Sequence, residues 1–239
     1  MTKTALITGG NSGIGYATAK LFTERGYAVT IAGRDEQKIE EAATELGVNA
    51  FVADMSNIDD LKRLGEHFNA IGLDALINNA GICQVAPIGM YNADLFSLHF
   101  DTNVRGPLFL IQELLPALEK RRGSITTVSS IVTVHGAPNV GLYAASKGAV
   151  EGFTRSLALE LAPRNIRINV ISPGAIDTPM FTKMGLTEEQ QKMVADHHIA
   201  SIPLKRFGAP AEVAEAVLAQ IECSYVTGSI WTVDGGVDA

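Results

Sequence analysis

The stretch TALITGGNSGIGYATAKLFTER, residues 4–25, places a short apolar run directly before a glycine-rich turn and a segment with helical periodicity. The apolar run predicts a buried strand, and the segment from Tyr16 to Arg25 predicts a helix. Glycines at such a junction let the backbone pass close under a pyrophosphate, and the helix start offers it free amides and a partial positive charge. We therefore expect a nucleotide-binding turn. Its key positions are Gly9, Gly13 and Gly15.

The spacing of these glycines is T-G-x-x-x-G-x-G, longer than the usual G-x-G-x-x-G fingerprint. A glycine-rich turn after a strand can be purely structural. Its place at the first strand-helix junction of the chain favours the nucleotide-binding interpretation.

Further apolar runs alternate with helical segments along the remaining chain. They predict strands at about residues 28–32, 49–53, 73–77, 125–128, 166–171 and 229–233. The 239 residues suit one domain with a substantial core, and 23 glycines with 46% hydrophobic residues fit a compact α/β fold with tight turns.

Charge and cysteine content argue against several functional classes. The formal net charge of -7, with no basic cluster longer than Lys120-Arg121-Arg122, argues against a nucleic-acid surface. Cys83 and Cys223 have no neighbouring metal ligands in sequence, so neither a disulfide framework nor a metal site is expected. We expect a cytoplasmic protein without membrane contact, because a strand begins at once after the N-terminus and no apolar run could span a bilayer.

The tip of the second expected strand bears on cofactor choice. An acidic residue there would accept from the ribose hydroxyls of NAD, whereas an arginine accommodates the extra phosphate of NADP. Gly33 occupies the position of the acid and Arg34 follows it, so the sequence favours NADP(H). NAD(H) stays possible, because Arg34 could be a solvated residue at a helix start and Asp35 lies one position further on.

Polar residues also follow the third and fourth expected strands. Asp54, before Met55, could accept from an adenine amino group or could simply close a turn. Asn78-Asn-Ala-Gly81 could pack against a bound nucleotide, with an ordinary turn as the alternative. The helical pattern from about Ala93 to Lys120 contains Gly106-Pro107, and this proline predicts an interruption near Asn103.

Ser130, Tyr143 and Lys147 form the candidate catalytic group. A helix from Tyr143 to Glu160 would place Tyr143 and Lys147 one turn apart on the same face. We expect the ammonium to lower the pKa of the phenol and make it an acid or base near neutral pH. Ser130 would emerge at the carboxyl end of the strand before it, where open α/β sheets bind ligands. On these three residues alone an ordinary amphipathic pair is the favoured interpretation, and the remaining chain has to decide.

The last third of the chain predicts a sixth strand, then a substrate lid at about residues 180–207, then a final helix and strand. His197 and His198 lie in the lid, but adjacent residues of a helix point in different directions, so no metal site is expected there. Met180, Phe181, Met184 and Leu186 indicate a moderately hydrophobic substrate.

Taken together, these motifs resemble the classical short-chain dehydrogenase/reductase family over essentially the whole chain. The resemblance rests on Thr8 to Gly15, the N-N-A-G at Asn78 to Gly81, Asn103 in N-V-x-G, and Ser130 followed by Tyr143-x-x-x-Lys147. Pro173-Gly174 with Thr178, and Asp234-Gly-Gly, match the family in the C-terminal third. The resemblance implies a Rossmann-type doubly wound parallel sheet of about seven strands with helices on both faces.

The resemblance also implies roles for matching residues. Tyr143 would exchange a proton with the substrate oxygen, Ser130 would bind that oxygen, Lys147 would hold the nicotinamide ribose, and Asn103 would anchor a water. The expected cofactor contacts are Gly9, Asn11, Ser12, Gly13, Ile14, Gly15, Arg34, Asp54, Met55, Asn79, Ala80, Gly81, Tyr143, Lys147, Pro173, Gly174, Ile176 and Thr178. One departure is that Gly10-Asn11-Ser12 lacks the basic residue of many NADP-preferring members, which leaves the phosphate to Arg34 nearly alone.

The expected function is hydride transfer between NADP(H), or NAD(H), and a small carbonyl/alcohol substrate, by a homotetramer built on the helices around Asn103 and Tyr143. An alternative is a 3-oxoacyl-carrier-protein reductase, which would need a basic patch from Arg121, Arg122 or Lys205-Arg206 to dock an acidic carrier. A second is a non-catalytic nucleotide-sensing protein on the same fold. Retention of Ser130, Tyr143 and Lys147 favours an enzyme.

Overall fold

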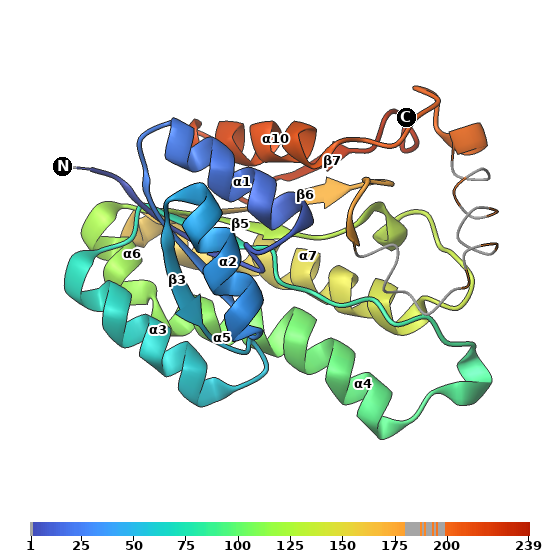
Figure 1. Cartoon of the computed structure of the whole chain (residues 1–239), viewed down its shortest axis with the longest axis horizontal. Helices are drawn as coiled ribbons and strands as arrows, with labels where there is room; N and C mark the ends of the chain where they lie inside the picture. The colour runs from blue at the N-terminus through green and yellow to red at the C-terminus, as the bar shows by residue number, and fades with distance from the viewer. Residues whose placement is uncertain (1, 180–186, 188, 190–192, 194, 196–198) are drawn as a thin grey trace.

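The computed structural model describes residues 2–179, 187, 189, 193, 195 and 199–239, and its centre is a seven-stranded sheet (Figure 1). The strands are β1 (Thr4–Thr8), β2 (Ala28–Gly33), β3 (Asn49–Val52), β4 (Ala75–Asn78), β5 (Ser124–Val128), β6 (Arg167–Pro173) and β7 (Ile230–Val233). All pairs are parallel, in the order β3-β2-β1-β4-β5-β6-β7. The predicted Rossmann-type sheet is therefore confirmed, with its switch in strand order between β1 and β4.

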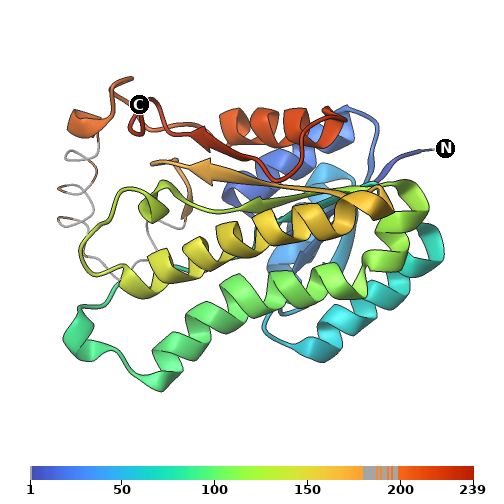
Figure 2. The ribbon, with the colours of Figure 1, turned by 180° about the vertical axis from the view of Figure 1, so that it is seen from behind.

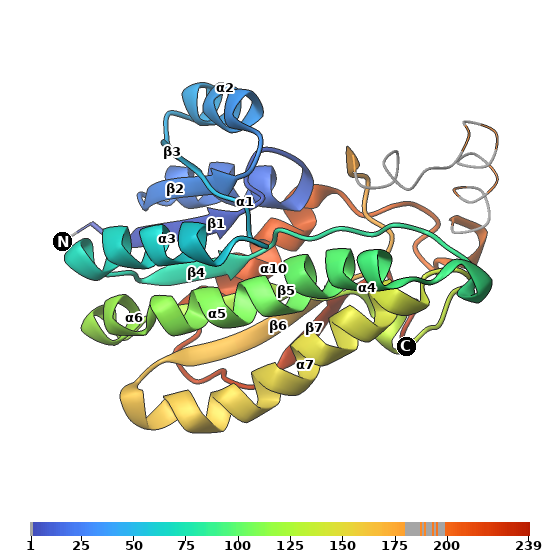
Figure 3. The ribbon, with the colours of Figure 1, turned by 90° about the horizontal axis from the view of Figure 1, so that it is seen from below.

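Helices cover both faces of the sheet, as predicted (Figures 1 and 3). One face carries α1 (Gly13–Glu24), α2 (Glu36–Leu46) and α10 (Pro210–Glu222), packed through a core that includes Phe22, Ile39 and Val217. The other carries α3 (Ile58–Ile71), α5 (Gly106–Glu113), α6 (Leu115–Arg121) and α7 (Gly141–Leu161), packed around Phe68, Leu110 and Leu161. Because both faces are covered, the central strands β1, β4 and β5 are buried along nearly their whole length rather than at alternate residues.

The helix α7 includes the predicted segment and begins two residues before Tyr143. Its inward residues recur at helical spacing, among them Ser146, Val150, Thr154 and Ala158. Seen from behind, α7 runs alongside α4 (Ala93–Phe100) and α5 (Figure 2). This places Tyr143, near the start of α7, at the edge where the strands end.

The helical segment around Asn103 is interrupted, as the sequence predicted. A π-helical turn, Asp101–Arg105, joins α4 to α5, and Pro107 lies in the first turn of α5. Proline has no amide hydrogen for the carbonyl four residues before it, which favours a break at this point. Gly106 is required here, because a Cβ at this position would lie 2.3 Å from the Met55 carbonyl oxygen. The turn therefore packs directly against the loop that follows β3.

Two further predictions concern the substrate lid and membrane-spanning helices. Much of the predicted lid lies outside the described residues, namely 180–186, 188, 190–192, 194 and 196–198, and with it Met180, Phe181, Met184, Leu186, His197 and His198. None of the described helices is long and apolar enough to cross a membrane.

Candidate active site

The glycine turn after β1 has the shape of a phosphate cradle. A Cβ on Gly15 would lie 2.3 Å from the Gly9 carbonyl oxygen and 2.4 Å from Asn79 Nδ2, so only glycine fits. Gly13 has φ of +55°, a conformation in which glycine is favoured. Within the described residues the Ser12 side chain makes no capping bond, so the first amides of α1 face outward without a partner in the helix. These features fit the pyrophosphate of a dinucleotide.

The segment after β4 is tied to this turn. Asn79 Nδ2 donates to the carbonyl oxygens of Thr8 at 2.9 Å and Gly9 at 3.2 Å, and the amides of Asn79 and Ala80 donate to Thr8 Oγ1. The structure thus brings Asn79 and Ala80 to the glycine turn, where the sequence expected cofactor contacts.

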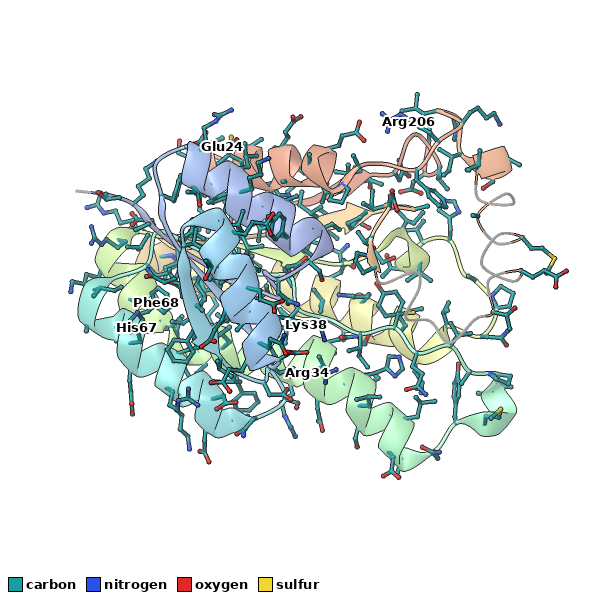
Figure 4. The ribbon with its side chains drawn as sticks, viewed as in Figure 1. Glu24, Arg34, Lys38, His67, Phe68 and Arg206 are labelled. Atoms are coloured by element: carbon teal, nitrogen blue, oxygen red, sulfur yellow. The ribbon has the colours of Figure 1, made fainter. Side chains whose placement is uncertain are left out.

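At the tip of β2 the residue that faces the glycine turn is Gly33. A Cβ there would lie 3.4 Å from Asn11 Oδ1. The carboxylate of Asp35 is engaged elsewhere, since it caps α2 by accepting from the Lys38 amide and pairs with Lys38 Nζ at 2.5 Å. Arg34 is exposed, and Figure 4 shows it with Lys38 at the start of α2. The tip therefore exposes Arg34, while the Asp35 carboxylate is paired with Lys38.

The sequence did not single out Lys38, which helps to line a pocket of about 320 Å³ beside the glycine turn. Asn11 and Ser12 line the same pocket, with Glu41 and Glu45 further along α2. Lys38 lies one turn into the helix that follows the tip of β2, and this position is the signal that could have identified Lys38 from the sequence.

The loop after β3 is held by its own side chains. Asp54 Oδ1 accepts from the amide of Ser56 at 2.8 Å and from Ser56 Oγ at 2.7 Å. Met55 is buried. Asp54 thus closes a turn in this structure, and one of its carboxylate oxygens makes both bonds.

The candidate catalytic residues meet at the carboxyl end of β5. Ser130 is the N-cap of the short turn that follows β5, and its hydroxyl lies close enough to Tyr143 to influence the pKa of the phenol. Lys147 is buried, and its Nζ lies 5.7 Å from the centre of the Tyr143 ring. The same ammonium donates to the Val128 carbonyl oxygen at 2.7 Å. The spacing along α7 and the position of Ser130 therefore bring the three side chains together.

The electrostatics of Tyr143 differ from the prediction. We expected Lys147 to lower the pKa of the phenol, but burial raises the pKa of Tyr143, and only the bond from Ser130 opposes this. Burial also lowers the pKa of Lys147 to about 8. The expectation was wrong because sequence spacing gives proximity alone, whereas desolvation dominates and the ammonium points to Val128 and the ring face.

Asn103 lies in the π-helical turn and is buried. Its Oδ1 accepts from the Ile82 amide at 2.9 Å, and its Nδ2 donates to the Ile82 carbonyl at 2.9 Å and to Ser146 Oγ at 3.0 Å. Both amide hydrogens are therefore used within the protein. Ser146 Oγ in turn donates to the Tyr143 carbonyl at 2.7 Å, which links Asn103 to the start of α7.

The segment after β6 closes the site from the other side. Pro173 is the last residue of β6, and a Cβ on Gly174 would lie 2.7 Å from that of Asp234. Ile176 pairs with Gly208, and the Thr178 side chain lies against Gly13. Thr178 therefore reaches the glycine turn, as a cofactor contact would require.

Cys83 is a further residue that the sequence did not place in the site. It is buried within electrostatic reach of both Tyr143 and Lys147, and burial raises its pKa to about 11. The thiol therefore stays neutral near pH 7. Its position two residues after Gly81 is the only sequence signal for it.

Comparisons with known proteins agree with this geometry. A family model described as enoyl-(acyl carrier protein) reductase matches residues 9–238. The oxidoreductase asL5 of Sarocladium schorii is 40% identical over 242 residues, covering 98% of this chain and 95% of that protein. The 3-oxoacyl-[acyl-carrier-protein] reductase FabG of Thermotoga maritima is 37% identical over 245 residues, covering 98% and 97%.

Solved structures agree as well. The 3-ketoacyl-(acyl-carrier-protein) reductase from Brucella melitensis, complexed with NADH, has a TM-score of 0.90 at 32% identity and covers 99% of this chain and 98% of that one. Fold and site thus define an NAD(P)-dependent oxidoreductase that acts on a CH-OH/C=O pair. The chain belongs to the short-chain dehydrogenase/reductase family.

Proposed function

We propose that this protein transfers a hydride between NADP(H) and a ketone/secondary alcohol pair, using Ser130, Tyr143, Lys147 and Asn103. The observation that carries the proposal is the meeting of Ser130, Tyr143 and Lys147 at the carboxyl end of β5, beside the glycine turn. The cofactor, when bound, supplies or accepts the hydride.

Tyr143 suits the role of proton donor in the reducing direction. Its raised pKa keeps the phenol protonated at neutral pH, ready to give a proton to a carbonyl oxygen. The hydrogen bond from Ser130 favours the phenolate that would remain. Ser130 would also donate to the substrate oxygen and stabilise charge that develops there.

Lys147 and Asn103 act around this pair. With a pKa of about 8, Lys147 is mostly protonated at neutral pH and can donate to the hydroxyls of the nicotinamide ribose. Asn103 holds Ile82 and Ser146, so its side chain ties the segment after Gly81 to the start of α7, where Tyr143 lies. Both amide hydrogens of Asn103 are taken, so a relay water there would bind by donating to one of the oxygens of Asn103.

The preference for NADP(H) is supported by charge at the tip of β2. Gly33 offers no carboxylate to the ribose, Arg34 is exposed, and Lys38 lies beside the pocket lined by Asn11 and Ser12. Lys38 would have to leave Asp35 to bind a phosphate. Arg34 and Lys38 thus replace the basic residue that the glycine turn lacks.

The test is a panel of ketones followed at the nicotinamide absorbance with each cofactor. We expect Arg34→Ala and Lys38→Ala each to raise KM for NADPH by about 10- to 100-fold, the effect of one lost charged hydrogen bond, and to leave KM for NADH unchanged. Tyr143→Phe should lower kcat by about 10²- to 10⁴-fold. Equal rates with both cofactors would refute the phosphate site, and turnover retained in Tyr143→Phe would refute the proton transfer.

A second candidate, a 3-oxoacyl-carrier-protein reductase, is favoured by the names of relatives such as the Thermotoga protein. The basic residues considered for docking do not gather on one surface. Arg121 and Arg122 end α6, whereas Arg206 lies at the opposite end of the molecule (Figures 1 and 4) and pairs with Glu212 at 2.7 Å. Comparing kcat/KM for one ketoacyl group on a carrier protein and on a short thiol tests this candidate, since a docking surface would favour the carrier.

We also propose assembly into a homotetramer through α4, α5 and α7. These helices lie side by side and expose apolar side chains, including Phe96, Phe109 and Leu159, the last 81% exposed. Exposed apolar groups on adjacent helices are typical of subunit contacts. Light scattering should give four times the chain mass, and Leu159→Glu should lower it.

A further inference from the structure

A buried carboxylate stands next to Ser130 that the proposed chemistry does not use. Glu151 lies on α7, one turn after Lys147, and is only 8% exposed. Acidic side chains are almost never this buried unless they are paired, because the charge must leave water. The partners of Glu151 therefore indicate what it does.

Two hydroxyl groups on either side of Ser130 donate to one oxygen of this carboxylate. Ser129 Oγ and Thr133 Oγ1 each lie 2.8 Å from Glu151 Oε1. Arg155 Nη2 lies 3.9 Å from the other oxygen, Oε2. Charged acceptors make hydrogen bonds about twice as strong as neutral ones, so these two bonds are strong local restraints.

Ser130 is the N-cap of a short 3₁₀ turn, Ile131–Thr133, which ends at the second of these hydroxyls. The Ser130 side chain accepts from the Val132 amide at 3.3 Å, and the Thr133 amide donates to the Ser130 carbonyl at 3.2 Å. Thr133 Oγ1 also lies 3.0 Å from that carbonyl, but its single proton goes to the closer, charged Glu151. The position of Ser130 thus depends on where the turn is held.

We propose that Glu151 is a positioning residue, which fixes the turn after β5 to α7 and so holds the Ser130 hydroxyl at Tyr143. Ser129 is anchored on its other side by its amide, which donates to the Ile171 carbonyl of β6 at 2.7 Å. The residues around Ser130 are therefore held by β6 on one side and, through Glu151, by α7 on the other. These two anchors form the frame that sets the distance between Ser130 and Tyr143. The proposal rests on the proposed function, in which Ser130 and Tyr143 act on the substrate.

The test compares Glu151→Ala with Glu151→Gln. Alanine removes the shared acceptor, so kcat should fall by about 10- to 100-fold, the cost of a misplaced catalytic group, while the dissociation constant of the cofactor stays within about twofold of wild type. Glutamine keeps an acceptor oxygen and should restore most of kcat. Glu160→Ala, on the exposed face of the same helix, is the matched control and should change neither value.

A double variant separates positioning from general stability. Because Glu151 acts through Ser130, Ser130→Ala/Glu151→Ala should be no slower than Ser130→Ala alone. The proposal would be overturned if the fold losses in kcat of the two single variants multiplied in the double variant. It would also be overturned if Glu151→Gln were as slow as Glu151→Ala. If Glu151→Ala does not fold, Thr133→Val takes its place and should lower kcat several-fold.

Hydrogen exchange gives a readout that does not need turnover. The amides of residues 131–135 should exchange faster in Glu151→Ala than in wild type or Glu160→Ala. Unchanged exchange would overturn the frame itself. Absence of turnover in wild type, with faster exchange in the variant, would instead reject the proposed function and leave the frame standing.

Discussion

The buried ammonium of Lys147 makes a prediction about stability and pH. Burial lowers its pKa from the ordinary 10.5 to about 8. Below pH 8 both the folded and the unfolded chain carry the proton, so the folded state bears the full cost of burying the charge. Between pH 8 and 10.5 the folded chain loses the proton while the unfolded chain keeps it. The unfolded state then binds more protons, and the free energy of unfolding rises with pH.

Lys147→Met isolates this contribution. The fall in pKa corresponds to about 3 kcal/mol when complete, most of which should be present by pH 10. At pH 7 the variant gains by losing a buried charge, but it leaves the Val128 carbonyl unpaired at a cost of about 1 to 3 kcal/mol, so the two proteins should be similar.

Urea unfolding at fixed protein concentration, from pH 7 to pH 10, measures the difference between the two proteins. We expect wild type to gain about 2 to 3 kcal/mol on the variant over this range. A difference that stays constant, or that moves in favour of the variant, would refute the reasoning. Groups that do not interact with Lys147 cancel in the comparison.

Two other substitutions test the site. Gly15→Ala would place a Cβ 2.3 Å from a carbonyl oxygen, so cofactor affinity measured by equilibrium dialysis should fall at least about tenfold. Gly148→Ala is the control: with open space around its Cβ, it should raise the free energy of unfolding by about 0.5 to 1 kcal/mol. Unchanged cofactor affinity in Gly15→Ala would show that the turn can open. Asn103→Ala removes three bonds to Ile82 and Ser146 and should lower the free energy of unfolding by about 2 to 4 kcal/mol, measured by urea titration; a change below 1 kcal/mol would contradict its bracing role.

The sequence was sufficient for the fold because its signals are local. Apolar runs mark the strands, and the glycine turn marks the first junction. Pro107 located the interruption near Asn103, but not its form, because a missing amide hydrogen does not decide between a kink and a π-helical turn.

The missing parts depend on contacts between distant segments. The pKa of Tyr143 rose because burial outweighs the spacing to Lys147, and burial cannot be read from two positions on a helix. Lys38 was missed because its pocket is shared with the glycine turn. Glu151 did leave a signal, since it falls on the inward face of α7, where an acid needs a partner.

The contact between Gly106 and the carbonyl of Met55, reinforced by Arg105 Nη2 donating to the Ser56 carbonyl at 2.8 Å, has a consequence for engineering. The loop that follows β3 and the turn that carries Asn103 are packed so closely that neither can change shape without the other. A chimaera that imports residues 53–57 from a relative should therefore also import residues 101–106. Exchanged alone, the loop would displace the turn and disturb the bonds of Asn103 to Ile82 and Ser146.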